Sequence, residues 1–556
     1  MPPVIAAAVT AAGITGSIGG VSIASLIGEG VTLGGIFALG QLTQPRTHQP
    51  AGQFQLTKQA VPPRVRVYGR VMMGGALYFQ AAPYIYQRGT YFCDGPIDAF
   101  EDIYLGDYLT VGIPTGIAGD YPWLDWITFE TQTGTIPQSR PASLNYPWWD
   151  ATHEGNGLAN IVMNCLIPYD PTGGKNLEQM FKTVYPSGVP ALRAVLRGSK
   201  IYDPRDVTQS WTDPTTWKWS QNSALCILDF LTSNRGYNIP NARIDLASFT
   251  AFAYLCDSTV LRYDGTTELA YVCWGSYRLD EEPRSVLERL LLTCDGELLQ
   301  QSDGTIGIRG GQFVTPSVTI TSDMILGYEV QNGPDKMSAF NEYRIHFTSP
   351  LQGYQLIEGN PYDDVVAQAA NGGQIIAQDL ELAFVPSDWQ AYRLAKIYMA
   401  QNNPEWLLTL TTTIAALDAL GERFVNVEID ELGISDSFLI KKFDISGDLR
   451  TCTLTLASLH ADTYNVMPSV DFGVWEYVAP STPVTIPNVT GLSDDHQHVS
   501  IGLDRQPTAG NRHRARRSKL RARCANQRGR RRDLDGYDGE RLLFGHLYDP
   551  GRRPDV

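Results

Sequence analysis

The sequence lacks the local motifs by which most catalytic and cofactor sites are recognised. It contains no H-E-x-x-H, no G-x-S-x-G, no Walker loop and no cysteine–histidine pair with a recognisable spacing. Its closely spaced glycines, Gly304, Gly307, Gly310 and Gly311, are typical of turns and are not set between a strand and a helix as a phosphate-binding loop requires. We therefore predict no catalytic residue, no cofactor and no enzyme activity.

Cysteines at metal-binding or redox spacing are missing as well. The eight cysteines are scattered along 556 residues, and no two form a C-x-x-C motif. This distribution predicts buried, reduced thiols in a protein assembled in the cytoplasm, rather than a disulfide framework or a zinc site. The one histidine cluster, D-D-H-Q-H at 494–498, follows a proline-rich stretch and lacks a fourth ligand placed by secondary structure. We predict no metal site there.

Positive charge is almost absent from the start of the chain and concentrated at its end. The first lysine or arginine is Arg46, so the apolar N-terminus lacks the basic leader of a secretory signal peptide. Residues 505–556 carry 15 basic and 6 acidic residues, which leaves residues 1–504 with 29 basic against 53 acidic groups. An acidic body binds DNA phosphate poorly. Two explanations of this acidity remain open: it keeps the protein soluble, or it lines a passage through which DNA slides without sticking.

Residues 1–48 form an apolar, glycine-rich segment whose only charge before Arg46 is Glu29. Each glycine costs a helix about 1 kcal/mol relative to alanine, which argues against a single-span anchor. The Gly-x-x-x-Gly spacing permits close helix packing. Two interpretations remain open, a segment buried in an oligomer and a membrane-active segment. The candidate residues for membrane contact are Gly16, Gly20, Ile23 and Leu26.

Composition and periodicity predict a β-rich α+β fold. The 52 glycines and 34 prolines favour short strands and turns. Helices are predicted from Ser223, as N-cap, to about residue 236, from Pro283 to Cys294, and from Pro386 to Ala400. Residues 296–308 predict a hairpin with Asp-Gly at its turn. Strands at 407–414, 424–429, 438–445 and 451–456 predict a small barrel or sandwich.

Two aromatic clusters stand out between residues 100 and 160, Y-P-W-L-D-W at 121–126 and Y-P-W-W-D at 146–150. Such clusters either bind sugars or partner proteins, or attach a loop to a sheet or fill a subunit interface. The candidates for surface or partner contacts are Trp123, Trp126, Trp148 and Trp149.

A series of segments, in a fixed order, resembles the tip attachment protein J family of lambda-like phage tails. The resemblance covers roughly residues 60–470, and the order matters more than any single match. The segments are Val65–Gly75, Cys93–Asp98, Ile103–Asp107, Arg197–Arg205, Trp219–Leu231, Cys294–Leu298, Asp303–Ile306 and Asn341–Ile345.

The resemblance implies a multidomain tail hub with small β-barrel or sandwich domains that form the tube. Hub domains are expected at 49–200 (β-rich), 201–345 (mixed α/β) and 346–480 (a helix and a barrel-like part). Residues 481–504 form a proline-rich linker and the opening of a truncated fibronectin-like module. Residues 505–556 are expected to be a dispensable tail, either a basic arm for nucleic acid or lipid headgroups or the product of a frame change.

The function that the resemblance implies is structural. A homotrimeric hub at the virion's tail tip closes the tail tube, contacts other tail proteins, docks distal fibre or receptor-binding proteins, and opens for passage of phage DNA. One alternative is an adhesin that contacts a host-surface glycan through Trp148 and Trp149. Another is a tail-associated cell-wall hydrolase, which would need two positioned carboxylates, and the sequence singles out no such pair.

Overall fold

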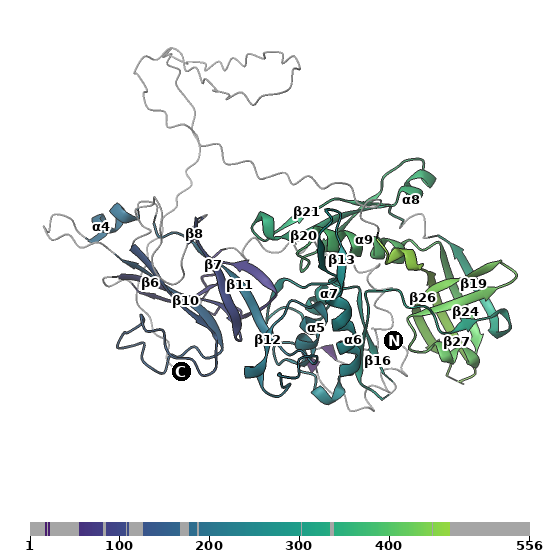
Figure 1. The fold of residues 1–556 in the computed structure, drawn as a ribbon, viewed down its shortest axis with the longest axis horizontal. Helices are drawn as coiled ribbons and strands as arrows, with labels where there is room; N and C mark the ends of the chain where they lie inside the picture. Colours follow the sequence, from purple (N-terminus) through teal and green to yellow (C-terminus); the bar gives the residue numbers. More distant parts are fainter. Residues whose placement is uncertain are drawn as a thin grey trace, which may run out of the picture. The chain divides into compact units, whose positions relative to one another are not determined.

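The computed structural model describes most of the chain between residues 55 and 466 (Figure 1). The described residues are 17–18, 21–22, 55–59, 61–81, 85–106, 108–110, 126–166, 177–185, 188–301, 303–333, 339–447 and 449–466. The chain divides into two compact units, Met1–Thr482 and Pro483–Val556, and every described residue belongs to the first. The predictions that lie outside the described residues concern Gly16, Gly20, Ile23, Leu26, Trp123, the histidine cluster at 494–498, and the segments 481–504 and 505–556. Within residues 1–48 the structure describes one antiparallel pair, β1 (Ser17–Ile18) and β2 (Val21–Ser22).

Two antiparallel sheets near the N-terminus share one hydrophobic core. The first has the order β5-β6-β10-β9, and the second has the order β12-β11-β7-β8 with β4 also paired to β11. The core between them draws on both sheets and on β3 and α4, through residues such as Phe92, Ile161 and Leu196. The elements are β3 (Val65–Tyr68), β4 (Arg70–Met73), β5 (Ala76–Ala81), β6 (Ile85–Asp94), β7 (Ile97–Leu105), β8 (Tyr108–Thr110), β9 (Ile127–Thr133), β10 (Leu158–Leu166), α4 (Leu177–Val184), β11 (Leu192–Ile201) and β12 (Lys218–Trp219).

Strand β10 shows why the first sheet is covered on both faces. Successive side chains of a strand point to opposite faces. Ile161 and Met163 enter the core between the sheets, whereas Val162 enters a separate small core on the other face. All seven residues between the ends of β10 are buried. A second layer must therefore cover the outer face of this sheet, and that layer is the long loop between β9 and β10.

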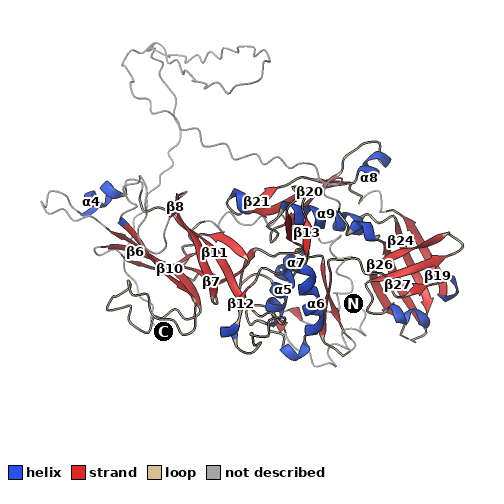
Figure 2. Cartoon of the chain, viewed as in Figure 1, coloured by secondary structure: helices blue, strands red, loops and turns tan. Residues whose placement is uncertain are grey.

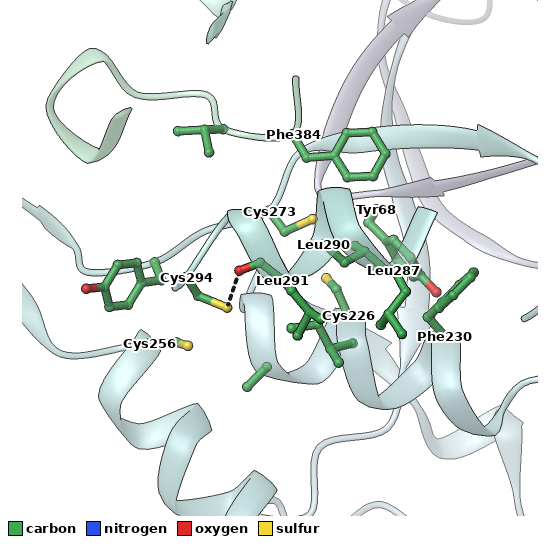
Figure 3. Packing of buried hydrophobic residues seen from close by; sticks show 14 of the residues in the cluster. Tyr68, Cys226, Phe230, Cys256, Cys273, Leu287, Leu290, Leu291, Cys294 and Phe384 are labelled. Carbon is green, nitrogen blue, oxygen red and sulfur yellow. Dashed lines mark hydrogen bonds between the residues drawn. The ribbon is translucent and has the colours of Figure 1, made fainter. Parts of the chain in front are cut away.

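Helices gather in the middle of the chain around the largest core (Figure 2). Helix α5 (Ser223–Thr232) is buried along nearly its whole length, and it packs against α6 (Leu246–Cys256) and α7 (Pro283–Leu292). Helix α9 (Asp388–Asn402) contributes Trp389 and Leu394 to the same core. Cys226, Cys256, Cys273 and Cys294 lie inside this core (Figure 3). All seven described cysteines are buried free thiols, as predicted.

Short strands complete the middle region. A four-stranded sheet is built on β20, which pairs with β21, β22 and, in parallel, β23. The hairpin predicted at 296–308 is confirmed as β16 and β17. The strands are β13 (Thr259–Leu261), β14 (Thr267–Leu269), β15 (Gly275–Arg278), β16 (Gly296–Gln300), β17 (Ile306–Gly310), β20 (Glu342–Ser349), β21 (Gln355–Glu358), β22 (Tyr362–Asp363) and β23 (Ala377–Leu382). The remaining helices are α8 (Val365–Ala370), η3 (Pro214–Thr216), η4 (Asn241–Arg243), η5 (Ser322–Met324), η6 (Pro350–Gln352), η7 (Ile414–Ala419) and η8 (Ala461–Thr463).

A six-stranded sheet with the order β18-β25-β26-β27-β24-β19 follows. Its two edge strands are consecutive in the chain, because β18 leads through η5 directly into β19. The sheet therefore curls toward a small barrel, as predicted, around a core that includes Leu410, Val427 and Leu454. The strands are β18 (Thr319–Ile320), β19 (Ile325–Asn332), β24 (Trp406–Thr413), β25 (Phe424–Ile429), β26 (Ile434–Ile445) and β27 (Thr451–Ser458).

Buried charges attach the barrel to the helical middle. Arg423, just before β25, donates from Nη2 to Asp295 Oδ2 at 2.8 Å. The Tyr464 hydroxyl donates to the same oxygen at 3.0 Å, and Gln401 Nε2 donates to Asp295 Oδ1 at 2.9 Å. Arg423 and Asp295 are both more than nine-tenths buried, so neither charge has access to bulk water. One carboxylate thus joins the hairpin region, helix α9 and the barrel.

The β-rich α+β fold is confirmed, and the three predicted helices exist with shifted ends. The prediction that Ser223 caps the first helix is wrong. The N-cap is Asn222, whose side chain accepts from the backbone N–H groups of Ala224 and Leu225, while Ser223 is buried inside the helix. The third helix begins at Asp388 and not at Pro386, because Ser387 provides its cap. The domain boundaries at 200 and 345 stay predictions.

Candidate interaction surface

The loop between β9 and β10, residues 134–157, covers the outer face of the first sheet. Phe79, Leu144 and Val162 form a small buried core there, and Tyr146 and Trp149 pack against it. Phe79 and Val162 come from strands, whereas the other three come from the loop. The loop thus buries apolar side chains that the sheet would otherwise expose, and it leaves Trp148 exposed.

Polar side chains fix the base of this loop. The carbonyl of the Gln138 side chain accepts from Gly134 N at 2.9 Å, and its amide donates to Gly155 O at 2.9 Å. The Glu130 carboxylate on β9 accepts from the backbone N–H groups of Ala142 and Ser143 at 2.6 and 2.9 Å. Gln138 therefore joins the two ends of the loop to each other, and Glu130 ties its middle to the sheet, which holds the aromatic residues in one arrangement.

A buried polar pair lies beneath the aromatic residues. Gln87 on β6 is 5% exposed and donates to Asn164 Oδ1 at 2.6 Å and to Ser143 O at 3.0 Å. Its side-chain carbonyl accepts from the Tyr146 hydroxyl. Burial raises the pKa of Tyr146, so the phenol stays a hydrogen-bond donor at ordinary pH. This contact fixes the orientation of the Tyr146 ring.

Four aromatic rings form what we call the aromatic shelf: Phe79, Tyr146, Trp148 and Trp149. The Trp148 ring lies nearly parallel to Phe79, at 5.4 Å and 15°, and to Tyr146, at 4.9 Å and 26°. The Trp149 ring meets Phe79 edge-on at 5.0 Å and 70°. Such offset and edge-to-face contacts add about 0.5–1.5 kcal/mol each beyond area burial. Although Trp148 is stacked in this way, it remains 58% exposed.

The turn that follows the shelf carries polar groups. Asp150 Oδ1 accepts from Thr152 N at 2.9 Å and from Thr152 Oγ1 at 2.5 Å. His153 Nδ1 lies 3.1 Å from the same oxygen and 3.2 Å from Asp150 N. These hydrogen bonds, those of Thr152 above all, lower the pKa of Asp150 to about 2. The His153 ring stacks on Trp149 at 4.5 Å. A carboxylate, a hydroxyl and an imidazole thus border the shelf.

The structure separates the tryptophans that the sequence grouped together. Trp148 and Trp149 lie together on the shelf, where Trp148 is exposed and Trp149 packs against the small buried core. Trp126 belongs elsewhere, because its side chain packs against the core between the two sheets and its carbonyl accepts from the Tyr185 hydroxyl at 3.2 Å. Its side chain is half-buried there, and its role as a surface or partner contact stays a prediction. Sequence reasoning missed Phe79 and Gln87, which lie about 60 to 70 residues away in the chain.

Among the described residues, no group of three or more His, Cys, Asp or Glu side chains is placed to hold a metal ion. No helix in the same part of the chain is long and apolar enough to cross a membrane.

Comparison with known proteins points to one fold. No protein-family model and no curated protein matches the sequence. A chain from the virion of a native gene transfer agent particle matches with a TM-score of 0.50 at 13% identity, covering 84% of this chain and 98% of that one. A 43 kDa tail protein of prophage MuSo2 from Shewanella oneidensis matches with a TM-score of 0.26 at 12% identity, covering 72% of this chain and 99% of that one. A tail protein from Neisseria meningitidis matches with a TM-score of 0.27 at 12% identity, covering 71% of this chain and 96% of that one. Both TM-scores are too low to show a shared fold. The described chain thus shares the fold of a gene transfer agent virion protein.

Proposed function

We propose that this chain is the structural hub at the tail tip of a long-tailed bacteriophage. Three copies would surround the tail axis, close the tube, dock distal fibre or receptor-binding proteins and open when DNA passes. The observation that carries the proposal is the fold shared with a virion chain over 98% of that chain. The ordered segments that resemble tip attachment protein J support the same role from the sequence.

Those segments have a structural reason to occur together, because they meet in one buried network. Arg66 on β3 donates to Asp229 on α5 at 2.9 Å, and the Tyr68 hydroxyl donates to the same carboxylate at 2.7 Å. Arg66 also donates to the carbonyl oxygen of Asp94 at the end of β6. Cys93 Sγ lies 3.7 Å from the Ser199 hydroxyl on β11. Four separate segments of the resemblance thus join the paired sheets to the helical middle.

The barrel supports assembly with further copies. Strand β19 pairs with β24 alone among the described strands, and six of its eight residues are exposed. They include Leu326, at 61% exposure, and Tyr328, at 39%. An edge strand with free backbone groups and exposed apolar side chains is a template for pairing with another chain. A neighbouring hub subunit or tube protein is the partner that we propose for it.

The experiment that tests this function is labelling of intact particles. Antibody against the chain, visualised by electron microscopy on particles from the producing host, should bind at the distal end of the tail. Particles without the chain serve as the control and should have no closed tail tip. Labelling of the capsid, or normal tails without the chain, would contradict the proposal.

A further inference from the structure

Trp148 is an exposed ring on a rigid support. Its 58% exposure does not reflect a loose loop, because Glu130 on β9, Gln87 on β6 and the carbonyl of Leu158 on β10, which accepts from Gln138, tie the loop to the sheet. A ring held in place before a ligand arrives loses little conformational entropy on binding. The eight segments that carry the resemblance do not include residues 134–157.

The size of the exposed apolar surface limits what the shelf can bind. Within the loop, the exposed large hydrophobic residues are Ile136 and Trp148. A stable protein–protein interface needs about 800 Å² from each partner, which two side chains cannot provide. A pyranose ring is a better match, since one of its faces is a patch of C–H groups about as large as an indole. Those C–H groups carry slight positive charge and face the negative side of the aromatic ring favourably.

The polar border matches the hydroxyl groups of such a sugar. Among the described residues, Thr152 and His153 contact the Asp150 carboxylate at Oδ1, and neither of them reaches Oδ2. An ionised carboxylate only accepts hydrogen bonds, and a sugar hydroxyl is a suitable donor. The loop carries Asp150 and Glu154 against Arg140, whose Nη1 already donates to Trp149 O at 2.9 Å. The net negative charge disfavours acidic sugars such as uronic or sialic acids, and neutral hexoses are the class that we favour.

We propose that the aromatic shelf binds a neutral hexopyranose of a surface glycan, with Trp148 stacking on the sugar face and Asp150 Oδ2 accepting from a hydroxyl. Tyr146 and Phe79 hold the indole in position from below, and they act as positioning residues. The inference rests on the proposed tail role only for the source of the glycan, the surface of the host cell.

The test measures binding of the purified full-length chain to an array of neutral and acidic oligosaccharides, followed by titration with the best neutral ligand. Trp148→Ala should weaken binding at least tenfold, whereas Trp148→Phe, which keeps an aromatic face, should weaken it less. Asp150→Asn should weaken binding severalfold. Tyr254→Ala removes an aromatic residue that is 61% exposed outside the shelf, and it should leave binding unchanged. Circular dichroism confirms that each variant folds.

Three results would overturn the inference: no glycan binding by the native chain, binding restricted to acidic glycans, or equal binding by Trp148→Ala. Quenching of tryptophan fluorescence by the sugar gives a second readout that needs no variant.

Particles carrying Trp148→Ala should assemble normally but adsorb poorly to host cells. Glycan binding by a chain that is absent from tails would refute the proposed function and leave the shelf intact. If the native chain binds no glycan and the Trp148→Ala chain fails to enter tails, the shelf is a contact between subunits and not a glycan site.

Discussion

At the scale of single residues, the buried pair of Arg66 and Asp229 is the most demanding feature of the framework. Both side chains are 3% exposed, and the carboxylate is shared with the Tyr68 hydroxyl. Breaking a buried pair leaves one charge without compensation and costs about 3–5 kcal/mol. We therefore expect Asp229→Asn to lower the free energy of unfolding by about 3–5 kcal/mol in urea denaturation.

The control for this variant is an exposed pair. Lys182 and Glu178 lie 2.7 Å apart on α4, with side-chain exposures of 68% and 73%. Because surface pairs contribute about 0–1 kcal/mol, Glu178→Gln should change stability little. Equal effects of the two substitutions would show that the buried network does not hold the paired sheets to the helical middle.

Lys441 gives the barrel a dependence on pH. Burial lowers the pKa of Lys441 to about 8, from its usual 10.5, although Asp295 and Glu297 oppose this shift. Below pH 8 the lysine is charged in both the folded and the unfolded chain, and its burial destabilises the fold. Between pH 8 and 10.5 the unfolded chain binds more protons, so this lysine's contribution to stability rises with pH.

Lys441→Met should therefore stabilise the chain at pH 7, and its advantage over the native chain should shrink as the pH rises from 8 to 10.5. Thermal unfolding at a series of pH values measures this difference. Lys442→Met, whose side chain is 43% exposed, corrects for the loss of one positive charge. An advantage of Lys441→Met that stays constant across this pH range would contradict the prediction.

At the scale of elements, the start of helix α5 deserves a direct test. Asn222 caps the helix, and its amide also donates to Ala253 O on α6 at 2.8 Å. Loss of an N-cap costs about 0.5–2 kcal/mol. The hydrogen bond to Ala253 O adds about 0.5–1.5 kcal/mol, because this carbonyl keeps a second donor, Asp257 N, at 3.1 Å. Asn222→Ala should therefore destabilise the chain more than Asp364→Ala, which removes the cap of the short helix α8. Chemical denaturation compares the two, and equal losses would argue against the second role of Asn222.

The elements that the sequence predicted have an amphipathic or alternating pattern, or a clear cap or turn. Pro283 marks the start of α7, and Asp303-Gly304 marks the turn of the hairpin. Helix α6 was missed because its sequence, L-A-S-F-T-A-F-A-Y-L-C, is apolar on nearly every side and shows no periodicity. Asp245, which caps α6, is the signal that could have located it.

The candidate site was only partly predictable for a related reason. Local composition singles out Trp148 and Trp149, and it singles out Trp126 equally. Whether a tryptophan faces the core or the solvent depends on which strand it follows and what lies across the sheet. Phe79 and Gln87 reach the shelf from β5 and β6, and no local pattern connects them to residues 146–150.

At the scale of the whole molecule, the exposed edge of the barrel predicts association through β19. Replacing Leu326, which is 61% exposed, with Glu places a charge on this edge without disturbing a core. Light scattering of the full-length chain should show a trimer for the native protein and smaller species for Leu326→Glu. Leu449→Glu is the matched control, because this leucine is 69% exposed between β26 and β27 and should not affect association. A stable native dimer would count against the trimeric hub.

The central claim concerns where the chain sits in a particle. A cryo-electron microscopy density map of an assembled tail tests it most directly, because the folds of the paired sheets and the six-stranded barrel can be fitted as separate shapes. The account predicts three copies around the tail axis at its distal end, with β19 at a contact between chains and Trp148 facing outward. Copies located away from the tail tip, or arranged without threefold symmetry around the axis, would contradict it.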